Sequence, residues 1–263
     1  MLRGFANDAN TVRAVTAGAD RSLLMRDQYL QLIERMEFAL SHQLVLDDVH
    51  RLLHTDRYWH VLDMDSATPR PYPLVNAEIE SRMAALTEAA DELAARIALW
   101  SGPEGWHTTV LDTNVLVRVE PPWQVPWPQI VGRDCVRLVI PLRVIEELEK
   151  LKYTNDTKVR QVVRKLVPQL ESKLLDNGSD PIRLDPKITL EVPVEPGLRD
   201  RPIHADEEIL TTCESILQFT GRQELTLVTD DTGMHLQARA RGIATKRVPD
   251  EFKRTLDEVS DPS

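Results

Sequence analysis

Acidic residues recur in this sequence where an apolar, β-branched run ends or where a helix is expected to begin. The acids in such positions are Asp112, Glu146, Glu147, Asp206, Asp230 and Asp231. Carboxylates that gather at one place repel one another and need a cation, and hard divalent ions prefer oxygen ligands. This pattern therefore predicts a site for Mg²⁺ or Mn²⁺ that could support phosphate chemistry.

Each acid also has an ordinary explanation when it is taken alone. Asp112 and Asp206 could cap helix N-termini, and Asp230 and Asp231 could form a turn. Glu147 could pair with a lysine on the surface of its own helix. The combination favours a shared site, because several separate strand-to-helix junctions carry a carboxylate toward the same edge of a sheet.

The elements that must position these acids are short strands alternating with helices. Strands are expected at residues 108–111, 136–140 and 225–229, and helices at 142–153, 158–175, 206–220 and 232–241. This alternation predicts an α/β fold with a parallel sheet and helices on its faces.

The first hundred residues follow a helical pattern instead. Helices are expected over about residues 21–44, 47–62 and 73–100, and the last of these has apolar residues at heptad spacing from Ile79 to Trp100. Such a seam is compatible with an antiparallel helical hairpin or small bundle, and also with an intermolecular coiled coil that would make a homodimer. Turn-forming residues at 101–107 predict a boundary between the two parts.

Four blocks of the sequence, in order, resemble the conserved blocks of the PIN domain family. They are Val110–Leu116, Ile140–Lys152, Asp206–Leu210 and Leu227–Asp231, and the resemblance covers about residues 106–250. It implies a three-layer α/β/α domain with a central parallel sheet, in which acids bind one or two Mg²⁺ or Mn²⁺ ions. It also implies a ribonuclease that cuts single-stranded RNA and leaves a 5′-phosphate and a 3′-hydroxyl.

The resemblance also assigns roles to individual residues. The family's acids fall on Asp112, Glu147, Asp206 and Asp231, which would be the catalytic and metal-binding residues. Glu147 is preferred to Glu146 because the Glu-Leu pair before a lysine is the matching feature, and Asp230 is the alternative to Asp231. Supporting hydrogen bonds to a carboxylate or water are expected from Asn114 and Thr229.

The three expected regions are a helical part at 1–105 that we match to no family, the PIN-like domain at 106–250, and a polar tail at 251–263. The formal charge of the chain is −10, which argues against a surface that binds nucleic acid everywhere. Residues 150–173 nevertheless hold seven basic and two acidic side chains. The basic residues expected to contact RNA are Arg143, Lys150, Lys152, Lys158, Arg160 and Arg164, although a solvated helix face explains the segment equally well.

Other classes of protein fit the sequence less well. No apolar run is long enough to cross a bilayer, so we expect a cytoplasmic protein. The histidines are scattered along the chain and no Cys or His spacing indicates zinc. A HAD-type phosphohydrolase would need a second aspartate where Asn114 stands. The remaining alternative to an enzyme is a slow or latent PIN scaffold that recruits RNA or a protein partner through its helical arm.

Overall fold

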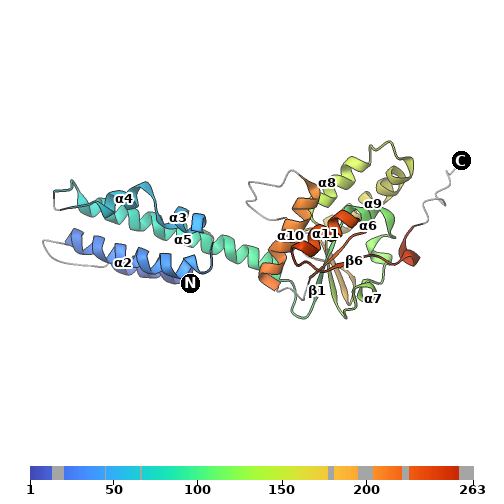
Figure 1. Cartoon of the computed structure of the whole chain (residues 1–263), viewed down its shortest axis with the longest axis horizontal. Helices are drawn as coiled ribbons and strands as arrows, with labels where there is room; N and C mark the ends of the chain where they lie inside the picture. The colour runs from blue at the N-terminus through green and yellow to red at the C-terminus, as the bar shows by residue number, and fades with distance from the viewer. Residues whose placement is uncertain are drawn as a thin grey trace. The chain divides into compact units, whose positions relative to one another are not determined.

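The computed structural model describes residues 1–13, 21–44, 46–65, 67–176, 181–194, 204–220 and 225–254 (Figure 1). The chain divides into two compact units, Met1–Ala95 and Arg96–Ser263. In the described part of the chain, every helix is too short or too polar to span a membrane.

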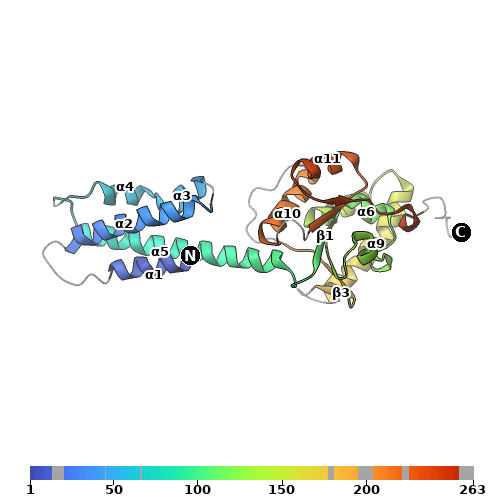
Figure 2. The same cartoon turned by 60° about the horizontal axis from the view of Figure 1, so that its bottom comes forward.

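The N-terminal unit is built from helices, as the sequence predicted. These are α1 (Leu2–Arg13), α2 (Arg21–Ser41), α3 (Leu46–Leu53), α4 (Asp56–Leu62) and most of α5 (Pro71–Ser101). Figure 2 shows α1 and α2 lying along the first part of α5. Their apolar faces share one core, which includes Met25, Tyr29, Ile33 and Ile79. Burial of this shared apolar surface holds the helices together.

Two details of this unit differ from the sequence pattern. The helix expected at 47–62 is two helices, because the Thr55 side chain accepts a hydrogen bond from Tyr58 N and caps the start of α4. The heptad seam of α5 is buried at Ile79 and Leu86 but 37% exposed at Leu93 and 43% exposed at Ile97.

The second unit contains a six-stranded sheet with the strand order β3-β4-β2-β1-β5-β6. The strands are β1 (His107–Leu111), β2 (Val136–Val139), β3 (Ile182–Asp185), β4 (Ile188–Glu191), β5 (Leu225–Val228) and β6 (Thr245–Lys246). All pairings are parallel except that of β3 with β4, so the sheet is mixed rather than purely parallel. The hairpin of β3 and β4 was not predicted.

Helices lie on both faces of this sheet (Figures 1 and 2). They are α6 (Thr113–Arg118), α7 (Trp127–Val131), α8 (Leu142–Leu151), α9 (Thr157–Asp176), α10 (Ala205–Thr220) and α11 (Thr232–Ala240), with short 3-10 turns at Pro122–Gln124 and Asp250–Phe252. Every residue of β1, β2 and β5 is buried, as expected for parallel strands covered on both faces. Of the predicted polar tail, residues 255–263 lie outside the described residues.

The order of the strands fixes where a site can form. The chain runs from β1 to β2 on one side, and returns with β5 to the other side of β1. Such a reversal leaves a crevice beyond the carboxyl ends of the two strands where the order changes. Here those strands are β1 and β5, which end at Leu111 and Val228, two residues paired in register.

Candidate active site

Asp112 lies at the centre of the candidate site. It directly follows β1, and its backbone N–H donates to the carbonyl of Val228 on β5 at 3.2 Å. Its extended backbone makes it the first residue outside α6. Because it stands where β1 gives way to a helix, only 3% of its surface is exposed.

The Thr229 hydroxyl holds the Asp112 carboxylate. Thr229 Oγ1 donates to Asp112 Oδ2 at 2.6 Å and accepts from Asp231 N at 3.1 Å, so one buried hydroxyl serves two acidic positions. Thr229 is fully buried, whereas Asn114 is exposed on the first turn of α6. Thr229 therefore makes the kind of contact expected of a supporting residue.

Burial raises the pKa of the Asp112 carboxyl above its ordinary value. The Thr229 hydroxyl and the backbone amides of Asn114 and Thr113 act in the opposite direction, and the negative charge of Asp206 adds to the increase. Asp206 is thus close enough to repel Asp112. Two acids that repel each other, one of them buried, are a favourable environment for a cation.

Glu147 joins the site from α8. The Thr113 hydroxyl donates to Glu147 Oε2, which links α8 to the residue that follows Asp112. Glu146 instead lies beside Arg143, with Arg143 Nη1 at 3.3 Å from Glu146 Oε2. Glu147 thus contacts the residue that follows Asp112, and its choice over Glu146 as the helix acid stays a prediction.

Asp206 and Asp231 are exposed at the starts of α10 and α11. Asp231 Oδ1 accepts from Met234 N at 2.8 Å and caps α11. The neighbouring Asp230 has a different environment, because its side chain is 7% exposed and lies 3.2 Å from Lys253 Nζ. Lys253 compensates the charge of Asp230, whereas the accessible carboxylate at this strand end is that of Asp231.

The four predicted acids carry oxygen donors only, which fits a hard divalent cation better than zinc. Within the described part of the chain, no three of these four carboxylates bring oxygen atoms within 4.8 Å of one another, unlike the donor atoms of Glu37, His50 and His54 in the N-terminal unit. Three of these carboxylates accept hydrogen bonds from protein groups. The donors are the Thr229 hydroxyl to Asp112, the Thr113 hydroxyl to Glu147 and the Met234 N–H of α11 to Asp231. Asp112, Asp206, Asp231 and Glu147 are the residues that could hold Mg²⁺ or Mn²⁺.

The role of Glu208 was not predicted from the sequence. Its side chain is buried on α10, and Glu208 Oε2 lies 3.9 Å from Arg143 Nε on α8. This ion pair links the helix that carries Asp206 to the helix that carries Glu147. Arg143, which we expected to contact phosphates, is thus surrounded by two carboxylates of its own domain. Only the acidic run at 206–208, followed by an apolar pair, could have drawn attention to Glu208.

The predicted basic residues have varied surroundings. Lys150, Lys158 and Arg164 are exposed, on α8 and α9. Lys152 Nζ lies 2.6 Å from Glu149, and Arg160 donates to the carbonyl of Thr154 at 3.2 Å.

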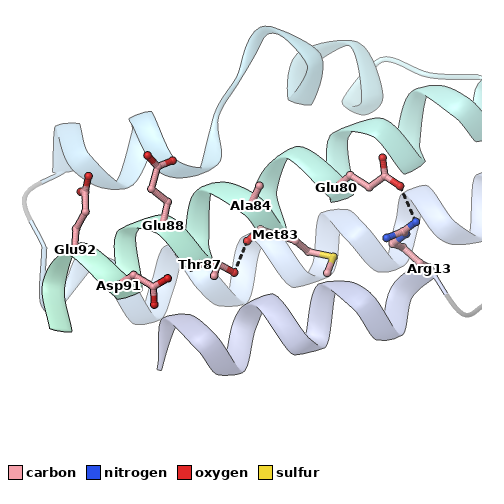
Figure 3. A pocket seen from close by; sticks show the side chains of 8 residues that line it. All are labelled: Arg13, Glu80, Met83, Ala84, Thr87, Glu88, Asp91 and Glu92. Atoms are coloured by element: carbon pink, nitrogen blue, oxygen red, sulfur yellow. Dashed lines mark hydrogen bonds and ion pairs between the residues drawn. The ribbon is translucent and has the colours of Figure 1, made fainter. Parts of the chain in front are cut away.

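The N-terminal unit has an open groove of its own, shown in Figure 3. It is lined by Arg13, Glu80, Met83, Ala84, Thr87, Glu88, Asp91 and Glu92. Arg13 Nη2 meets Glu80 at 2.7 Å, and the remaining charged groups of the lining are carboxylates. The Thr87 hydroxyl of this lining donates to the carbonyl of Met83 at 2.8 Å.

A family model described as "PIN domain" matches residues 109–248, more than half of the chain. The chain belongs to the PIN domain family. The matched range contains all four predicted acids of the PIN domain and leaves out the N-terminal helices. PIN domains are generally nucleases that use divalent metal ions, so the family supports a metal-dependent nuclease.

Comparison with solved structures found a similar chain described as "a domain of a functionally unknown protein from Methanocaldococcus jannaschii DSM 2661". It is 18% identical, the match covers 54% of this chain and 91% of that chain, and the TM-score is 0.33. No curated protein matches this PIN domain protein.

Proposed function

We propose that this protein is a metal-dependent endoribonuclease that hydrolyses single-stranded RNA. The observation that carries the proposal is the placement of Asp112, which is buried at the carboxyl ends of β1 and β5, accepts a hydrogen bond from Thr229 and is affected by the charge of Asp206. Among the contacts described, no lysine or arginine lies beside the Asp112 carboxylate, whereas Lys253 lies beside the carboxylate of Asp230. The difference between the two aspartates supports a metal role for Asp112.

A bound Mg²⁺ or Mn²⁺ ion would offset negative charge on the scissile phosphate and make water a better nucleophile. Asp112 and Asp231 would hold the ion, with Asp206 and Glu147 completing its surroundings or accepting the proton of the attacking water. Thr229 and Thr113 would keep two of these carboxylates oriented through the hydrogen bonds described above. The attack would break the bond to the 3′-oxygen and leave a 5′-phosphate.

RNA binding is proposed for the basic residues that follow Glu147. Lys150, Lys158 and Arg164 are exposed, and α8 packs on α9. The cations along this pair of helices would attract the phosphate backbone of RNA toward the acids. Without them, the negative net charge of the chain would repel that backbone. Binding through these residues should therefore weaken steeply as salt is added.

The seam of α5 supports a further proposal, a homodimer through the N-terminal helices. Leu93 and Ile97 continue the buried heptad positions but stay exposed. Sedimentation should show a dimer at micromolar concentration that Leu93→Glu with Ile97→Glu dissociates. A monomer at every concentration would exclude it.

The nuclease is tested by incubating labelled single-stranded RNA with the full chain, with Mn²⁺ or Mg²⁺ and with EDTA. The matched variants are Asp112→Asn and Asp134→Asn, which make the same substitution at the buried site and at an exposed position before β2. We expect cleavage that needs the metal, survives Asp134→Asn and is lost in Asp112→Asn. Equal cleavage by all three proteins would indicate a contaminant, and no cleavage by any would favour a scaffold.

A further inference from the structure

We infer a second metal site in the N-terminal unit, formed by Glu37, His50 and His54 and suited to Zn²⁺. The histidines are scattered along the sequence, but the fold brings two of them together with a carboxylate. One donor atom from each residue lies within 4.8 Å of the other two. The site is separate from the PIN acids and does not depend on the proposed nuclease.

Local structure explains how the two imidazoles meet. His50 is on α3, and the N–H of His54 donates to the carbonyl of His50 at 2.8 Å, so the helical turn extends through His54. Residues four apart on a helical turn share one face. The two rings accordingly have centroids 5.1 Å apart.

The carboxylate comes from a different helix. Glu37 is in the last part of α2, which packs against α3, and Glu37 Oε2 lies 3.6 Å from His54 Nε2. In a tetrahedral zinc site with bonds of about 2.0–2.1 Å, neighbouring ligand atoms are about 3.3 Å apart. The Glu37–His54 pair is already near this spacing, and exposed His50 can complete the set by a change of rotamer.

The surroundings of His54 restrict its movement. Its ring centroid lies 4.8 Å from that of Tyr58 and 5.7 Å from that of Trp59, and its side chain is 13% exposed. The His54 imidazole is therefore already oriented before any ion binds.

The donor set selects the kind of metal. Two imidazoles and one carboxylate suit borderline transition ions, of which Zn²⁺ is the common case, whereas Mg²⁺ prefers oxygen ligands alone. Three protein ligands leave a fourth position for water, on the side where His50 is exposed. A bound ion would join α2 to the end of α3 and stabilise the helical unit at the break before α4.

The test is titration of the full chain with Zn²⁺ by calorimetry, in the presence of saturating Mg²⁺. The variants are His50→Ala and Glu37→Gln, which change exposed or half-exposed side chains and should leave the fold intact. The matched control is His42→Ala with His60→Ala, which removes two exposed imidazoles from the same unit. We expect one Zn²⁺ equivalent in the wild type and the control, and at least tenfold weaker binding in each site variant.

Thermal unfolding gives a second readout. Zn²⁺ should raise the unfolding temperature of the wild type and the control, and this shift should disappear in His50→Ala and Glu37→Gln. Equal Zn²⁺ binding in all these proteins would overturn the inference. So would loss of Zn²⁺ binding in Asp112→Asn with retention in His50→Ala, because the ion would then be in the PIN acids.

Discussion

The hydroxyl of Thr229 and the carboxylate of Asp112 meet at 2.6 Å, although they are 117 positions apart in the sequence. The bond crosses from the end of β5 to the end of β1, at the point where the strand order reverses. A buried carboxylate needs such a donor because water has little access to it.

Replacing Thr229 with valine should therefore destabilise the protein and impair cleavage. The variant keeps the shape of the side chain but leaves Asp112 without its hydroxyl donor, which should cost about 1–3 kcal/mol of unfolding free energy. Urea unfolding measures this loss. The control is Thr109→Val, because Thr109 is equally buried on β1 and its hydroxyl has no hydrogen-bond partner in the described structure. A loss of the same size in both variants would contradict the importance of the Thr229 bond.

The raised pKa of Asp112 predicts how the stability of the metal-free protein depends on pH. A folded-state pKa above the unfolded one means that the folded state binds more protons, so this group lowers stability as pH rises. The decline should begin near the unfolded pKa of about 4 and continue through the higher folded value.

Asp112→Asn should consequently be more stable than the wild type at pH 7 in EDTA, since it removes a buried charge. Mn²⁺ should stabilise the wild type and leave the variant nearly unchanged. Unfolding curves in urea at several pH values, with and without the metal, measure both effects. If the variant is less stable than the wild type in EDTA at neutral pH, burial of the Asp112 charge does not destabilise the folded protein as predicted.

Asp231 should separate a structural role from a catalytic one. Asp231→Asn retains a side-chain oxygen that can accept from Met234 N, so stability should change by less than about 0.5 kcal/mol. Asp231→Ala removes the cap of α11 and should cost about 1 kcal/mol. Cleavage of RNA should be lost in both variants, because both lack the carboxylate. If Asp231→Asn keeps its cleavage activity and only Asp231→Ala loses it, Asp231 serves only as a cap.

Gly102 should tolerate a side chain poorly. Its φ of +62° favours glycine, and an added Cβ would lie 3.0 Å from the Cδ and Nη1 atoms of Arg137. Arg137 is buried, pairs with Glu191 and donates to the carbonyls of Leu99 and Trp100, so it cannot easily move.

Gly102→Ala should therefore cost more than about 1 kcal/mol of unfolding free energy. Gly105→Ala is the control, because Gly105 has a φ of +77° but open space around it. The difference between the two variants measures the crowding against Arg137. Equal losses would show that backbone conformation alone accounts for the effect.

The central strands were predictable from the sequence because they are buried and β-branched throughout. The apolar runs before Asp112 and Asp230 marked the ends of β1 and β5, and parallel pairing then placed those ends at one edge. The hairpin of β3 and β4 was not predicted, because each strand has one buried residue instead of a continuous buried run, and only a turn at Pro186 and Lys187 separates them. Such partly buried strands depend on pairing with the sheet more than on their own pattern.

Contacts between helices were the least predictable part of the sites. The pairing of Arg143 with Glu208 depends on how α8 packs on α10, and the meeting of Glu37 with His54 depends on how α2 packs on α3. Sequence spacing describes one helix at a time. The four-residue interval from His50 to His54 can be read from the sequence, but the proximity of Glu37 cannot.

The position of β5 after β1 to β4 in the chain has a consequence for synthesis on the ribosome. A nascent chain that ends before Leu225 lacks the strand that pairs with β1, the hydroxyl that holds Asp112 and the carboxylate of Asp231. The helical unit and the strands β1 to β4 emerge first, without a complete acidic site. A nuclease arranged in this way would become active only after residues 225–231 have left the ribosome.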